Sequence, residues 1–395
     1  MAQFSRIVDA SLEHHHYRLV NRQPDVAGQR QCSHEDGGET GKLSHVQAFE
    51  NWNNRLRRLL KPHVERATLH GIAFSLCALS LAGCTQTLDD LREEAREVPA
   101  KLLSDMKAKG MSQQSPVLVR IFKMESELEI WKVDRSGKYA LLKKYPMCRW
   151  SGKLGPKTTD GDRQAPEGFY SVSTSRLNPK SQFFLSFNLG YPNRLEEALG
   201  YTGEALMVHG ACSSSGCYAM SDQGIGEIYA VVENALHGRQ TAFQVQAYPF
   251  RMTPKNLAMY RNDPNMPFWK NLKEGYDAFE VTRREPRVSL CGKKYVFNAT
   301  FAGGEPSNPL DACPPRIDQP DLAVTAKTNS DIEKADLITA NSPQPLAYED
   351  GGMHPNFRTL LEQDGAAKFS KRISTTKYPI SRPAAALADP FMNGG

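Results

Sequence analysis

Apolar and polar residues alternate along the chain just downstream of residue 115, with the two-residue period of half-buried strands. The alternation predicts strands over Val117–Lys123, Glu127–Val133 and Tyr139–Tyr145. A turn-forming sequence, Asp134-Arg-Ser-Gly137, separates the last two of these. Consecutive strands with such short connections predict an antiparallel meander.

Strand and helix periods alternate beyond the meander. Four more strands are predicted, at Gly168–Thr174, Gln182–Phe187, Leu206–His209 and Thr241–Tyr248. One helix is predicted from the apolar residues Ile225, Ile228, Tyr229, Val232 and Leu236, with a stop at Gly238. Two further helices are predicted, one beginning at Thr253-Pro254 and one marked by Phe268, Leu272, Tyr276 and Phe279. The pattern therefore predicts an α+β fold that is mostly β.

Composition sets the limits of this folded body. Residues 251–315 continue the helical and strand patterns and are expected to be a C-terminal extension. Beyond them Pro, Ala, Ser and Asp dominate and aromatic residues become rare, so we expect 316–395 to be a largely disordered tail. On the N-terminal side, 85–114 carries leucines at loose helical spacing and is expected to be a short helix or tether.

The most apolar run of the chain, Ile72–Ala82, is too short to cross a bilayer core of roughly 30 Å and is typical of a signal peptide. Basic residues precede it, and Leu81-Ala-Gly-Cys84 resembles the lipobox at which bacterial lipoproteins are cleaved and acylated. We therefore predict a lipoprotein signal peptide over 61–84, with Cys84 as the lipidation site. A short buried helix that happens to end in Gly-Cys is the alternative.

The leader also predicts where the protein is located. Thr85, rather than an acidic residue, follows Cys84, which resembles outer-membrane sorting in Gram-negative bacteria. Acylation gives stable membrane attachment, and export implies an oxidising compartment. We therefore expect a periplasmic protein that is lipid-anchored to the outer membrane. A leader should begin its chain, so the polar residues 1–60 are expected to be disordered or to precede the true translation start.

Charge and cysteine usage exclude some classes of partner. The net charge is +5 and the pI about 8.6, but the basic residues do not gather in one run. Nucleic-acid binding requires a clustered basic face, so we expect no nucleic-acid partner. The eight cysteines include no CxxC pair, which argues against a zinc ribbon. We expect no metal and no cofactor.

The candidate chemistry lies in Met207–Asp222, where a predicted strand leads into His209-Gly210 and a loop of small residues ends in Gly216-Cys217. An imidazole beside a thiol stabilises the thiolate and relays its proton. The Gly210 carbonyl could orient the imidazole, and Gly216 leaves nearby amides able to face an oxyanion. This arrangement predicts Cys217 as a nucleophile and His209 as its base.

Three other interpretations of the same residues stay open. His209, Cys212 and Cys217 could be metal ligands, although a fourth ligand at metal-like spacing is missing. Cys212 and Cys217 could form a structural disulfide, or Cys217 could be a buried apolar thiol. Farther along the chain, Cys291 and Cys313 flank a Gly-Gly-Glu-Pro loop and are either a disulfide or two separate thiols.

The arrangement His-Gly…Ser-x-Gly-Cys resembles the active site of the YkuD-type L,D-transpeptidases, and of their YafK-like branch in particular. The resemblance extends to Tyr145-Pro-Met-Cys-Arg-Trp150, Ser151-Gly-Lys-Leu-Gly-Pro-Lys157, Gly161-Asp162 and Ala165-Pro-Glu-Gly-Phe-Tyr170. It implies a catalytic domain over 115–250, built on a mixed β-sheet with one packed helix.

The resemblance also implies roles for single residues. Cys217 matches the family's nucleophile, His209 its catalytic histidine, and Gly210 the position whose carbonyl completes the triad. Gly216 and Tyr218 match the region that supplies oxyanion amides.

Two positions depart from the usual family pattern. Ser215 stands where most members have a second histidine, and Ala219 where they have Arg or Asn. Both departures recur in the YafK-like branch and bear on substrate choice, so Ser215 is a candidate substrate-binding residue.

The implied reaction is acyl transfer at a peptidoglycan stem peptide through a Cys217 thioester. An amine acceptor gives L,D-transpeptidation, whereas water gives hydrolysis, as in members that release peptidoglycan-linked protein such as a lipoprotein. A non-catalytic peptidoglycan-binding lipoprotein is a further alternative. Arg149, Lys153 and Lys157 lie in a Gly/Pro-rich segment and are candidates for holding a stem-peptide carboxylate, or else form a solvated basic loop.

Overall fold

The computed structural model describes residues 96–338 and 347–390. The predicted leader, the Cys84 lipidation site, segment 1–60 and the start of 85–114 lie outside the described residues. None of the helices in the described ranges is long and apolar enough to cross a membrane.

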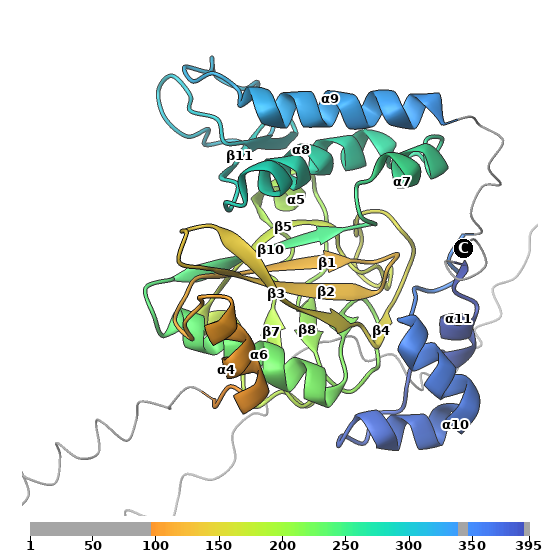
Figure 1. The fold of residues 1–395 in the computed structure, drawn as a ribbon. Helices are drawn as coiled ribbons and strands as arrows, with labels where there is room; N and C mark the ends of the chain where they lie inside the picture. The colour runs from red at the N-terminus through yellow and green to blue at the C-terminus, as the bar shows by residue number, and fades with distance from the viewer. Residues whose placement is uncertain (1–95, 339–346, 391–395) are drawn as a thin grey trace, which may run out of the picture. The chain divides into compact units, whose positions relative to one another are not determined.

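The predicted meander is confirmed and forms three strands of a five-stranded sheet (Figure 1). Its strands are β1 (Val117–Phe122), β2 (Glu127–Val133) and β3 (Tyr139–Pro146). Strand β10 (Ala242–Tyr248) lies beside β1 in parallel, and β5 (Gly168–Ser173) closes the order β3-β2-β1-β10-β5. The central strand β1 is buried along its whole length, as expected of a strand that is covered on both faces.

A second five-stranded sheet carries the candidate site, in the order β4-β9-β8-β7-β6. Its short strands are β4 (Arg149–Trp150), β6 (Leu177–Asn178), β7 (Ser186–Asn188), β8 (Met207–His209) and β9 (Tyr218–Ala219). The strand predicted over Gln182–Phe187 is only partly right. The chain turns at Phe184, whose φ is +74°, so pairing begins at Ser186.

Helix α6 (Asp222–Leu236) packs against strands of both sheets, and its predicted apolar face is confirmed. It buries Ile225, Ile228 and Val232 in the main core. Ser221 caps its N-terminus by accepting the Gly224 amide, a favourable start for a helix. The smaller elements of this part are helices α4 (Ala100–Ala108) and α5 (Arg194–Ala198) and the 3-10 turn η1 (Thr174–Arg176).

The extension over 251–315 contains α7 (Pro254–Met259), α8 (Met266–Thr282) and the hairpin β11 (Val288–Cys291) and β12 (Lys294–Phe297). Both helices begin with proline in the first turn, where its missing N–H costs nothing. A disulfide joins Cys291 to Cys313, which closes the loop that follows the hairpin. Of the two alternatives that the sequence left open for this pair, the structure contains the disulfide.

The prediction that 316–395 is largely disordered is wrong for its described part. Helices α9 (Leu322–Leu337), α10 (Pro355–Ile373) and α11 (Pro383–Leu387) lie there (Figure 1). Composition misled because these helices dock through few apolar side chains. Residues 347–390, called the C-terminal arm below, bury Met353, Leu361, Phe369 and Ile380 in a small apolar cluster.

Helix α9 is held to α8 by buried charges rather than by apolar area. The Lys273 ammonium lies 2.7 Å from an Asp277 carboxylate oxygen and 2.8 Å from one of Asp331, and all three residues are buried. Burial raises the pKa of Asp277 although Lys273 opposes the change. Lys327 reaches Asp331 from the solvent side. The ammonium of Lys273 is therefore the counter-charge for two carboxylates taken out of water.

Replacing Lys273 by Met should destabilise the protein by about 3–5 kcal/mol, because it leaves two buried carboxylates without their main counter-charge. The urea midpoint of unfolding measures the change. Lys368→Met is the matched control, because the Lys368 side chain is exposed and its ion pair with Asp364 lies within α10. Equal midpoints for the two variants would contradict the role given to Lys273.

Candidate active site

The candidate site is built on the parallel pair β8–β9. Val208 lies opposite Tyr218, and His209 lies opposite Ala219. Val208 and Tyr218 both point into the main core. Because side chains alternate along a strand, His209, one position after Val208, faces the other side of the sheet. Cys217 lies in the bend just before β9, where its Sγ is 3.9 Å from the carbonyl oxygen of Ala205.

Hydrogen bonding fixes the orientation and tautomer of His209. Its Nδ1 lies 2.7 Å from the carbonyl oxygen of Gly210. A carbonyl can only accept, so Nδ1 carries the proton and Nε2 has a lone pair in the neutral ring. Nε2 is buried and has no hydrogen-bond partner among the described residues. The Phe183 ring packs against the imidazole, with a centroid distance of 4.8 Å.

The β8–β9 loop, residues 210–217, returns the chain in a short span and does so with unusual backbone angles. Ala211 and Cys212 have φ of +66° and +50°, and Gly216 has +126°. Residues other than glycine adopt the left-handed backbone region at a cost of about 1–3 kcal/mol each. The loop therefore needs restraints from its surroundings.

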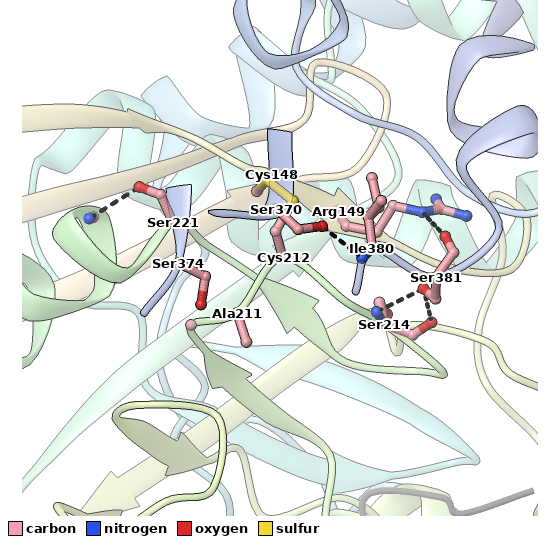
Figure 2. The surroundings of a disulfide bond; sticks show 12 residues. Cys148, Arg149, Ala211, Cys212, Ser214, Ser221, Ser370, Ser374, Ile380 and Ser381 are labelled. Carbon is pink, nitrogen blue, oxygen red and sulfur yellow. Dashed lines mark hydrogen bonds between the residues drawn. A yellow bond between two sulfur atoms is a disulfide. The ribbon is translucent and has the colours of Figure 1, made fainter. Parts of the chain in front are cut away.

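One restraint is a disulfide between Cys212 and Cys148, which lies between β3 and β4 (Figure 2). This pairing rules out the Cys212–Cys217 disulfide that the sequence left open, and Cys217 is a buried thiol. It also removes Cys212 as a thiolate ligand, and no cluster in the described ranges could hold a metal ion.

Serine hydroxyls hold the end of the loop. Ser214 Oγ donates to the Cys217 carbonyl at 2.7 Å and lies 2.9 Å from Ser151 Oγ. The Gly216 amide donates to the same Ser151 hydroxyl. The amide predicted to face an oxyanion thus has a partner within the protein, and the Tyr218 backbone lies in the β8–β9–β4 ladder.

Arg149 does not form the predicted carboxylate-binding site or the alternative solvated loop, because it is fully buried. Its guanidinium donates to the carbonyls of Asp350 and Ser381 and lies 3.6 Å from the Asp350 carboxylate. Burial lowers the pKa of Arg149 to about 10, although Asp350 opposes the change. Arg149 is therefore an anchor for the C-terminal arm.

The other predicted substrate-binding residues differ in their partners and in their exposure. The Lys157 ammonium is buried and bonds Asp162 Oδ1 at 2.6 Å, so it closes its own loop. Ser215 Oγ accepts from Arg163, which also pairs with Asp350. Lys153 is exposed at the surface. Of the three basic candidates, only Lys153 thus presents its charge to solvent.

The C-terminal arm covers the β8–β9 loop. Ser381 Oγ accepts from the Ser214 amide and donates to the Ser214 carbonyl, as Figure 2 shows. Tyr378 stacks on Phe183 with centroids 4.4 Å apart, and Phe183 in turn packs on His209. Cys217 and His209 are 0% and 1% exposed. Parts of the chain far apart in sequence thus enclose the candidate pair.

Sequence reasoning missed three contributors to the site: Cys148, Asp222 and the C-terminal arm. Cys148 lies within a segment already quoted for the family resemblance, but its spacing from Cys212 gives no pairing. Asp222 closes the quoted motif directly after the helix cap Ser221, where an acidic residue is usually explained by the helix alone. The arm has no motif that could have marked it.

Comparisons with known proteins place this site in a family context. The model of the YkuD family, described as the L,D-transpeptidase catalytic domain, matches residues 129–281. The chain is 47% identical over 184 residues to the protein named "Putative L,D-transpeptidase YafK" of Escherichia coli (strain K12), covering 47% of this chain and 74% of that protein. The range 129–281 includes the whole second sheet, helix α6 and the first sheet except β1 and the first two residues of β2.

Solved structures resemble the chain more distantly. The helical cell shape determining protein Pgp2 from Campylobacter jejuni is 21% identical, with a TM-score of 0.27 and coverage of 37% of this chain and 54% of that one. Bd1075 from Bdellovibrio bacteriovorus is 13% identical, with a TM-score of 0.26 and coverage of 44% and 76%. This chain therefore spans about half the length of the Pgp2 structure.

The disulfide pattern predicts which cysteine can be alkylated. In protein unfolded without reductant, iodoacetamide should label Cys217 and spare Cys148, Cys212, Cys291 and Cys313 until a reductant is added. Peptide mass spectrometry reads the labels. A peptide that links Cys212 to Cys217, or label on Cys212 before reduction, would sink this assignment.

Proposed function

Because this chain belongs to the L,D-transpeptidase family with the YkuD catalytic domain, whose substrate is peptidoglycan, we propose that it is a peptidoglycan-modifying cysteine enzyme. Cys217 is the nucleophile and His209 the general base and acid. The observation that carries the proposal is the Nδ1–Gly210 hydrogen bond, which leaves a buried Nε2 lone pair on His209 with no hydrogen-bond partner among the described residues.

The chemistry follows from this tautomer. His209 Nε2 takes the thiol proton of Cys217, and the sulfur attacks the carbonyl carbon of a stem-peptide bond. The C–N bond of the tetrahedral intermediate breaks while His209 returns the proton to the leaving amine, which gives a Cys217 thioester. An acceptor amine then attacks the thioester and loses a proton to His209. The C–S bond breaks, the thiol is restored, and a new amide is released.

Two features of the site shape this mechanism. An oxyanion that uses the Gly216 amide competes with Ser151, which accepts that hydrogen bond in the free enzyme. Burial of Cys217 also means that substrate must displace covering groups before it reaches the sulfur. If these covering groups close over a bound stem peptide, they keep water from the thioester and so favour an amine acceptor.

The proposal extends to the place of action. A lipobox-like Leu81-Ala-Gly-Cys84 after an apolar run supports acylation of Cys84 and attachment to the outer membrane from the periplasmic side. The two disulfides of the described chain agree with an oxidising compartment. Peptidoglycan stem peptides would meet the enzyme there.

Cys217→Ala and His209→Ala should each lower turnover of purified muropeptides by about 10³-fold or more, because each removes a group that handles the reacting atoms. Liquid chromatography with mass spectrometry measures both products: new cross-links indicate transfer, and shortened stems indicate hydrolysis. His237→Ala is the matched control, since this exposed histidine follows α6. Unchanged product levels with Cys217→Ala would refute the enzyme proposal.

The leader makes a separate prediction about the mature protein. Mass spectrometry of protein purified from a Gram-negative host should find an N-terminus at an acylated Cys84, and Cys84→Ala should release the protein from the membrane fraction. A mature N-terminus upstream of Ile72 would show that no lipoprotein processing occurs.

A further inference from the structure

The peptide unit between Gly210 and Ala211 is bonded at both ends. Its carbonyl accepts the Nδ1–H of His209 at 2.7 Å. Its N–H, on the Ala211 side, donates to Asp222 Oδ1 at 2.9 Å. One rigid amide plane therefore connects the imidazole to a carboxylate, although the two side chains belong to β8 and α6.

Asp222 is itself firmly held. It is only 6% exposed, and it lies in the first turn of α6, where the helix dipole favours a negative charge. Ser374 Oγ lies 3.1 Å from each carboxylate oxygen, and the backbone N–H and hydroxyl of Thr375 donate to Oδ2 at 2.7 and 2.8 Å. Two residues of the C-terminal arm thus satisfy a buried charge that also binds the β8–β9 loop.

A cap for α6 does not explain this carboxylate. Ser221 already caps the helix by accepting the Gly224 amide, so Asp222 is not needed there. Packing is also tight at the peptide unit, because a Cβ on Gly210 would lie 2.7 Å from Asp222 Oδ1. The contact between Asp222 and this amide therefore depends on glycine at position 210.

The contact has a chemical consequence for the imidazole. Hydrogen bonds in a chain strengthen one another, so an amide whose N–H donates to a carboxylate has a more strongly accepting carbonyl. That carbonyl holds His209 Nδ1–H more firmly and stabilises the imidazolium that forms when Nε2 takes a proton. The amide plane also cannot rotate without breaking its bond to Asp222.

We propose that Asp222, completed by Ser374 and Thr375 of the C-terminal arm, is a positioning residue that orients and polarises the Gly210–Ala211 peptide that holds His209. The inference rests on the proposed function of Cys217 and His209. It adds that the arm is a component of the active site, because its residues complete the hydrogen bonding of the carboxylate.

Three variants separate the parts of this arrangement. Asp222→Asn keeps an oxygen for the Ala211 amide but loses the charge, and should lower kcat about tenfold with little change in KM. Asp222→Ala removes the acceptor and should lower kcat about a hundredfold, the effect of a misplaced catalytic group. The double variant Ser374→Ala with Thr375→Val removes two of the hydroxyl donors and should lower kcat about fivefold.

A spectroscopic measurement makes the test independent of turnover. The ring Nδ1–H proton of His209, assigned by its loss in His209→Ala, should move upfield in Asp222→Asn because its hydrogen bond weakens. Asp318→Asn, which lies outside the arm and accepts hydrogen bonds from Arg316 and the Thr300 amide, is the matched control and should change neither kcat nor the resonance.

The outcomes distinguish failure of this inference from failure of the proposed function. If wild type turns over muropeptides while Asp222→Asn and Asp222→Ala keep kcat within twofold and the resonance unmoved, the positioning role is overturned. If the resonance moves as expected but wild type has no activity, the proposed function fails and the coupling to His209 stands. Should Asp222→Ala not fold, the isosteric Asp222→Asn and the arm variant decide.

Discussion

The short parallel connection between β8 and β9 is the constraint on which the site depends. Parallel neighbours are usually joined by a long crossover, but here residues 210–217 must reverse the chain and bring it back beside the strand it left. Left-handed backbone at Ala211 and Cys212 makes that return possible. The same loop joins His209, at the end of β8, to Cys217, just before β9, so the strained backbone lies between the two candidate catalytic residues.

Restraints on this loop come from three distant parts of the chain. Cys148 binds it covalently from the β3–β4 connection, Asp222 holds it from the start of α6, and Ser381 bonds it from the C-terminal arm. No one of them is part of the loop, so the loop's conformation depends on the whole domain being folded. The arm in turn is fixed by the buried pair between its Asp350 and Arg149 on β4, which explains why this basic residue faces inward.

Sequence patterns predicted what depends on local periodicity. The meander and the apolar face of α6 follow from the spacing of side chains, and His209, Gly210 and Cys217 stand out through their types and order. Pairing of Cys148 with Cys212 could not be deduced, because spacing alone does not select among cysteine partners. The arm was missed because it docks through a few apolar residues and many polar bonds, which composition reads as disorder. The role predicted for Arg149 was wrong because its partner Asp350 lies about two hundred residues later in the chain.

The contacts of the arm divide into strong and weak ones, and the division matters for access to His209. At Ser374 and Thr375 the arm makes several buried hydrogen bonds to a charged carboxylate, which are the costly kind to break. At Tyr378 it makes a ring stack with Phe183 and one exposed hydrogen bond to Gln182, and the tyrosine is 36% exposed. Opening the site therefore costs least between Phe183 and Tyr378, above His209. A bound molecule that displaced these rings would reach the imidazole while Asp222 stayed bonded to the loop, so entry at this point and alignment of His209 do not depend on the same contacts.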